Sequence, residues 1–225
     1  PMEDIKSGIN KLLNVLRRPL DDFPYEKPHT DSFFGICIQN NAEVISRLNT
    51  IRPYILEINK KEFTEKIKSL LITLWTDVQK FTDYYLIKEN ILFPLIEKHI
   101  TDYRCIAVMW SVHDDIRRNI NELLDILKFD NTDLQRLNRL TGDIFYNIYT
   151  IIFREERLLY PYIQKFVPTD EIEAIWNESI ESGFPYINPP KKENAIEENK
   201  IPSELIDMKS GQLTAEQIVL IFSHL

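Results

Sequence analysis

Apolar residues recur at helical spacing along nearly the whole chain, and this pattern constrains the fold more than any other feature. They repeat at intervals of three and four residues, and no stretch shows the alternation typical of a half-buried strand. Only five of the 225 residues are glycine. Core helices are expected over about 32–50, 61–99, 104–128 and 132–166. Four long helices with short connections predict an all-α, up-down four-helix bundle, with extra helices at both ends.

The segments outside the bundle divide the chain into three predicted parts. Residues 1–31 form an N-terminal helix and loop, and the helix is expected to stop at Arg18 because a residue that precedes proline disfavours helix. The bundle and one following helix occupy 32–183. Residues 184–225 form a proline- and charge-rich linker and a terminal helix.

Two capping boxes mark predicted helix starts, since a hydroxyl residue followed three positions later by Glu or Gln is typical of a helix N-terminus. Thr132 and Gln135 fit this pattern for the fourth bundle helix, and Thr214 and Gln217 fit it for AEQIVLIFSHL. That last helix is still apolar at Leu225. We therefore expect that it continues in a longer natural chain or buries its apolar face, with a homodimer as one partner.

Composition and charge exclude several kinds of partner. The net charge is -8 and no basic block stands out, so we expect no binding to nucleic acid. Cys37 and Cys105 form no metal-binding spacing and are expected to be reduced, as in an intracellular protein. No signal peptide is evident, and no apolar run approaches the roughly 20 residues that a membrane span needs. These features predict a soluble, cytoplasmic protein with no membrane partner.

A repeated segment suggests a pseudo-symmetric site. KENILFPLIEKH at 88–99 and EERLLYPYIQKF at 155–166 follow one pattern. In this pattern Glu89 aligns with Glu156, and a proline follows each glutamate at the same distance. Each proline removes one helical N–H group, so each helix is expected to kink or end nearby.

Three ionisable side chains from three predicted helices face the bundle axis. Glu89, His113 and Glu156 each share a helix face with apolar residues. Burying an ionised carboxylate without a partner costs several kcal/mol, so a pair, a proton or a cation is required. Bundles build metal sites from such side chains, and Glu and His suit iron, manganese or zinc. A metal-free network, with His113 bonded to one glutamate and an arginine paired with the other, is the open alternative.

Three segments together resemble the hemerythrin-like (HHE cation-binding) domain. They are ENILFPLIE at 89–97, WSVHDDIR at 110–117 and EERLLYP at 155–161. Within this family the chain resembles a prokaryotic subgroup in which a PAS sensor domain follows this domain, and the resemblance covers about residues 29–182 and the tail. It implies a bundle around a non-heme, usually di-iron centre that binds oxygen or nitric oxide, or senses iron.

The resemblance also implies which residues bind metal. Glu89 and Glu156 match the carboxylate ligands of the family, and His113 matches its third-helix histidine. Where the family has a histidine before each glutamate, this chain has tyrosine or isoleucine, so Tyr85 is a weaker candidate. The first helix lacks its histidine, and His29 in the preceding loop is the nearest substitute. With four histidines in the chain, a five-histidine centre cannot be built and reversible oxygen carriage is not expected.

These residues lead to three hypotheses for function. The first is a sensory or regulatory input module with a degenerate Glu/His site for one or two non-heme iron ions, or for manganese or zinc. It would respond to oxygen, nitric oxide or the metal and act on the terminal segment. The alternative is a metal-free helical scaffold for protein interaction. A di-iron oxidoreductase ranks last, because the ligands are too few.

Overall fold

The computed structural model describes residues 2–22, 25–60, 63–100, 104–129, 132–189, 206–208 and 211–213. The chain divides into two compact units, Pro1–Lys191 and Lys192–Leu225. In the second unit, strands β1 (Ile206–Met208) and β2 (Gly211–Leu213) pair antiparallel, with Ile206 opposite Leu213. No strand was predicted there, because three residues are too few to show an alternating pattern. The predicted terminal helix lies outside the described residues.

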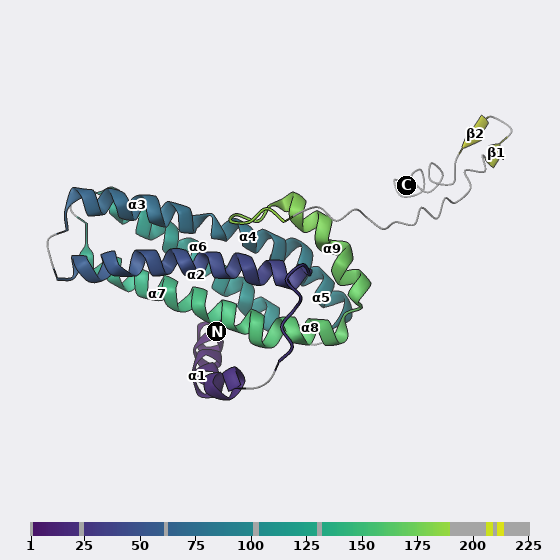
Figure 1. Cartoon of the computed structure of the whole chain (residues 1–225), viewed down its shortest axis with the longest axis horizontal. Helices are drawn as coiled ribbons and strands as arrows, with labels where there is room; N and C mark the ends of the chain where they lie inside the picture. The colour runs from purple at the N-terminus through teal and green to yellow at the C-terminus, as the bar shows by residue number, and fades with distance from the viewer. Residues whose placement is uncertain are drawn as a thin grey trace. The chain divides into compact units, whose positions relative to one another are not determined.

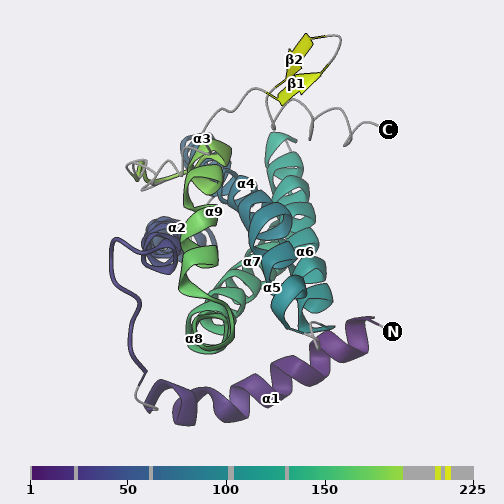
Figure 2. The ribbon, with the colours of Figure 1, turned by 90° about the vertical axis from the view of Figure 1, so that its right-hand side faces the viewer.

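The first unit is a four-helix bundle with a helix outside each end of it in sequence (Figures 1 and 2). Its elements are α1 (Met2–Asp22), α2 (Phe33–Ile58), α3 (Glu65–Gln79), α4 (Phe81–Ile87), η1 (Lys88–Leu92), α5 (Phe93–His99), α6 (Arg104–Lys128), α7 (Leu134–Arg154), η2 (Glu155–Leu159), α8 (Tyr160–Phe166) and α9 (Thr169–Ser182). Helix α2, the series α3–α5, helix α6 and the series α7–α8 form the four arms of the bundle. This arrangement confirms the predicted fold class. None of the helices in the described ranges is long and apolar enough to cross a membrane.

The bundle core follows the predicted apolar faces. On α2, Val44, Leu48 and Ile51 are completely buried, and they belong to one continuous apolar cluster that also contains Trp75. Ser32 begins this helix, where its side chain accepts a hydrogen bond from the backbone N–H of Gly35. In α2 the 3.6-residue period therefore predicts which side of the helix faces inward.

Three predicted helix boundaries were wrong. Helix α1 continues through Pro19 to Asp22, where Arg157 donates hydrogen bonds to backbone carbonyls of its last turn, including one of 2.8 Å to Asp21. Helix α2 continues through Pro53, which lies on the exposed side where water can satisfy the freed carbonyl. Helix α7 is capped by Asp133, which accepts the N–H of Arg136 at 3.0 Å, so the predicted capping box is not formed.

Each copy of the repeat forms a π-helical turn. Element η1 covers Lys88–Leu92, η2 covers Glu155–Leu159, and a proline lies in the first turn of the α-helix that follows each. A π turn carries one extra residue within a helix, and such turns are frequent at functional sites. The predicted irregularity at the prolines therefore takes the form of a widened turn.

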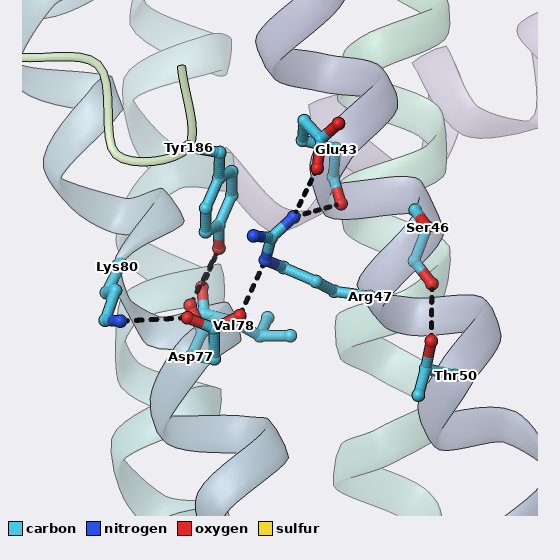
Figure 3. A network of polar contacts seen from close by, with 8 residues as sticks. All are labelled: Glu43, Ser46, Arg47, Thr50, Asp77, Val78, Lys80 and Tyr186. Carbon is cyan, nitrogen blue, oxygen red and sulfur yellow. Dashed lines mark hydrogen bonds and ion pairs between the residues drawn. The ribbon is translucent and has the colours of Figure 1, made fainter. Parts of the chain in front are cut away.

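The segment after α9 packs back onto the bundle (Figure 3). Gly183 ends α9 with a φ of 87°, a conformation that favours glycine. The hydroxyl of Tyr186 then donates to the carbonyl oxygen of Asp77 at 2.8 Å, and the Arg47 guanidinium lies 3.7 Å from the centre of the Tyr186 ring. Arg47 also donates to the Asp77 carboxylate at 2.7 Å. One arginine from α2 thus joins α3 to the returning segment.

Candidate functional site

The first polar cluster lies around Glu89, in the π turn η1. Its Oε1 is 2.8 Å from Nδ1 of His113, and its Oε2 accepts a hydrogen bond of 2.7 Å from Arg117. Burial raises the pKa of the Glu89 carboxyl, but the hydrogen bonds from His113 and Arg117 outweigh it and leave the pKa below its ordinary value. Glu89 is therefore an ionised carboxylate with both oxygens already bonded.

His113 is the most enclosed member of this cluster. Its ring is fully buried and is stacked on the ring of Tyr85 with centroids 3.8 Å apart. Burial lowers the pKa of His113, with the Glu89 hydrogen bond acting against it, so the imidazole is neutral at pH 7 and donates from Nδ1 to the carboxylate. Its Nε2 has no hydrogen-bond partner among the described residues. In a neutral imidazole that donates from Nδ1, this nitrogen keeps a free lone pair.

The second polar cluster is a buried ion pair between the two copies of the repeat. Nζ of Lys88 lies 2.6 Å from Oε1 of Glu155, and their side chains are 1% and 0% exposed. The other oxygen of Glu155 accepts hydrogen bonds from the Tyr160 hydroxyl at 3.2 Å and from the Asn41 amide at 3.4 Å. The Lys88 ammonium also lies 4.1 Å from the centre of the Tyr84 ring. The pair is thus surrounded by groups that stabilise both charges.

Glu156 lies at the edge of this second cluster. It is half-buried, and its Oε1 accepts a hydrogen bond of 3.1 Å from Asn41. Burial raises the pKa of its carboxyl, and this effect exceeds that of the Asn41 hydrogen bond. The sequence pattern predicted that Glu156 would point inward, but the structure completely buries the preceding residue, Glu155, instead.

The two weaker candidates lie in different environments. His29 has a side chain that is 78% exposed and approaches Asp31, so it lies on the surface and not at the bundle axis. Tyr85 is completely buried, and burial raises its pKa well above the ordinary value. A tyrosine that binds ferric iron does so as a phenolate, which this environment disfavours.

Sequence reasoning missed the central residues of the second cluster. Lys88, Glu155 and Asn41 were not considered. The metal-free alternative placed an arginine on the glutamate that His113 does not bond, whereas Arg117 and His113 bond the same carboxylate, Glu89. A signal was present, because the same repeat that aligns Glu89 with Glu156 also aligns Lys88 with Glu155. Opposite charges at equivalent positions of two facing helices indicate a pair across the axis.

The side-chain donors of the described residues do not fit a resident metal ion. No group of three or more His, Cys, Asp and Glu side chains in the described part of the chain is arranged to hold one. Both oxygens of Glu89 are engaged, and Glu155 is held by an ammonium group. A further cation would be repelled by Lys88 and Arg117 at short range. The metal-binding roles of Glu89, His113, Glu156, His29 and Tyr85 stay predictions.

Comparison with known protein families identifies a match over the bundle. The family described as the hemerythrin HHE cation-binding domain matches residues 39–163, which is more than half of the 225-residue chain. The matched range contains both π turns and both polar clusters. No curated protein matches the chain.

Proposed function

The chain belongs to the hemerythrin HHE cation-binding family, and from this premise we propose that it is a regulatory, protein-binding helical module with a metal-independent polar centre. Internal cations hold the inward carboxylates of that centre. The ion pair between Lys88 and Glu155, 2.6 Å long and inaccessible to solvent, carries the proposal. It supplies a positive charge from a side chain at the place where a cation-binding bundle would need one.

Electrostatics favours side-chain cations, and not a metal ion, beside the buried carboxylates Glu155 and Glu89. A buried carboxylate requires a compensating charge and satisfied hydrogen bonds, and Glu155 has an ammonium, a hydroxyl and an amide as partners. Glu89 similarly has a neutral imidazole and a guanidinium. Each carboxylate is thus satisfied by residues of this chain, and the predicted ligand atoms that remain free are too few for a coordination shell.

The proposed role follows from a rigid, satisfied centre. Oxygen or nitric oxide chemistry at a non-heme iron centre needs open coordination positions held by several ligands, which this arrangement does not favour. The bundle would therefore act by binding partners and not by catalysis. The regulatory part of the proposal, including a link to a PAS domain, depends on the predicted terminal helix, which lies outside the described residues.

Metal content tests the proposal directly. Untagged protein would be incubated anaerobically with ferrous iron, manganese or zinc, desalted and measured by plasma mass spectrometry, with thermal unfolding recorded with and without chelator. We expect substoichiometric metal in the parent and in Glu89→Ala, and no effect of chelator on the unfolding midpoint. His99→Ala, which changes a histidine bonded to Glu171, is the matched control.

The metal-binding sensor predicted from the sequence gives the opposite result. It requires stoichiometric metal in the parent, a loss of metal in Glu89→Ala and His113→Ala, and retention in His99→Ala. That outcome would contradict the metal-independent centre and support a metal centre at Glu89 and His113.

A further inference from the structure

An apolar groove lies between α1 and the bundle. Its volume is about 400 Å³, which is within the range of small-ligand pockets, about 300–1,000 Å³. Residues of α1, α6 and the arms α3–α5 and α7–α8 line it, and among the described residues that do so only Arg154 and Tyr162 carry polar groups. The lining includes Leu13, Ile96, Ile100, Val108 and Met109. No member of the two polar clusters is among these lining residues.

Arg154 is an unusual residue in the wall of this groove. It is only 8% exposed, and its Nη2 donates to the side-chain oxygen of Asn10 on α1. Its Nε and Nη1 are buried and have no hydrogen-bond partner among the described residues. Burial lowers the pKa of Arg154, and only the Tyr146 phenol acts in the other direction. A guanidinium stays charged in proteins, so this is a desolvated cation without a counter-ion.

The other buried cations of the described chain show what Arg154 lacks. Lys88 pairs with Glu155, Lys6 pairs with Asp115, and Lys68 lies 3.7 Å from Glu65 and donates to a backbone carbonyl. Arg154 is the one buried Lys or Arg of the described residues with no carboxylate beside it. Since an unpaired buried charge is costly, the position favours an anion supplied from outside the chain.

The geometry points to a binding site for a free amphiphilic carboxylate, such as a medium-chain fatty acid. Its head group would bind Arg154, and its unbranched tail would lie along the apolar groove under α1. A guanidinium and a carboxylate form charge-assisted hydrogen bonds, and Arg suits this partner better than Lys does. Lys6 with Asp115 and Arg157 with the Leu20 carbonyl attach the two ends of α1, so the ligand would be enclosed by a helix that is already in place.

Calorimetric titration of the full chain with decanoate and with decanol tests the site, because the two probes share a tail and differ in head-group charge. We expect saturable decanoate binding below its micelle range, at least about tenfold tighter than decanol binding. Arg154→Gln should abolish this preference, and Arg154→Lys should restore part of it. Arg139→Gln changes an exposed arginine on the same helix and should bind as the parent does. Circular dichroism confirms that each variant is folded.

Four results would overturn the inference. The parent could bind neither probe, or bind decanoate and decanol equally, which would leave only a non-specific apolar surface. Folded Arg154→Gln could retain the full preference for decanoate. Binding to vesicles of anionic phospholipid without binding to free decanoate would assign the anion to a membrane and contradict a free ligand. None of these results depends on whether the polar centre holds a metal.

Discussion

Replacing Lys88 with methionine would measure how far the polar centre depends on its internal cation. The substitution keeps a long, flexible side chain but removes the charge that lies 2.6 Å from Glu155. Glu155 would remain completely buried, with hydrogen bonds only from Tyr160 at 3.2 Å and Asn41 at 3.4 Å. Removing one partner of a buried ion pair costs about 3–5 kcal/mol, because the other charge is left without compensation.

Urea denaturation followed by circular dichroism would report this loss. With the slopes usual for small proteins, about 2–3 kcal/mol per M or somewhat more at this size, the midpoint of Lys88→Met should fall by roughly 1–2 M. The double variant Lys88→Met with Glu155→Gln removes both charges and should recover most of the stability, since neutral replacement of a buried pair is often tolerated. Lys128→Met breaks the exposed pair with Asp125 and should change stability by less than about 1 kcal/mol.

Two results would refute the reasoning. If Lys88→Met were as stable as Lys128→Met, the ion pair would contribute no more than a surface contact. If the double variant were no more stable than the single one, the loss would come from packing around residue 88 and not from the charge left on Glu155.

Three further predictions concern other residues of the bundle. Burial raises the pKa of the Cys37 thiol to about 12, so little reactive thiolate forms in the folded protein. In a Cys105→Ser variant, mass spectrometry should show that iodoacetamide modifies Cys37 only after unfolding. Modification of the native protein would contradict this prediction. A Cβ at Gly35 would overlap the carbonyl oxygen of His29, so the free energy of unfolding of Gly35→Ala should be about 1–3 kcal/mol lower in thermal unfolding experiments. Gly142 has open space around it, so Gly142→Ala should instead raise the free energy of unfolding by up to about 1 kcal/mol. Burial raises the pKa of Asp77, but hydrogen bonds from Lys80 and Arg47 outweigh this effect and leave the pKa below its ordinary value of 3.8. The parent should therefore be more stable than Asp77→Asn above pH 3.8, and this difference should vanish as the pH falls through the lowered pKa. A difference in stability that persists in acid would contradict the pairing.

The helices were predictable because a helix with one buried face carries apolar residues at intervals of three and four positions, and this pattern is visible in the sequence. Val44, Leu48 and Ile51 show this period and are all completely buried. The ends of helices were less predictable, because they depend on contacts between distant residues. Helix α1 passes Pro19 and ends where Arg157, far along the chain, bonds its last carbonyls. A rule that considers only the residues next to a proline cannot predict a contact with a residue so far along the chain.

The polar centre was only partly predictable for a related reason. A regular helical wheel directs Glu89 and Glu156 inward, and Glu89 is indeed buried. Each of these residues lies within a π turn, which adds a residue and rotates the side chains that follow relative to the wheel. The wheel therefore cannot distinguish Glu155 from Glu156 as the inward residue. The proline in each repeat was the available sign that the period would break.

The surroundings of the ion pair explain why the first repeat carries the lysine and the second carries the glutamate. Lys88 and Glu155 occupy equivalent positions, so the backbone alone would accept either charge at either place. On the Lys88 side the ammonium lies within 4.1 Å and 5.3 Å of the centres of the Tyr84 and Tyr85 rings, whose faces attract cations. On the Glu155 side the neighbours are hydrogen-bond donors, the hydroxyl of Tyr160 and the amide of Asn41. Exchanging the two charges would turn ring faces toward a carboxylate and donors toward an ammonium, so the surroundings fix which repeat carries the cation.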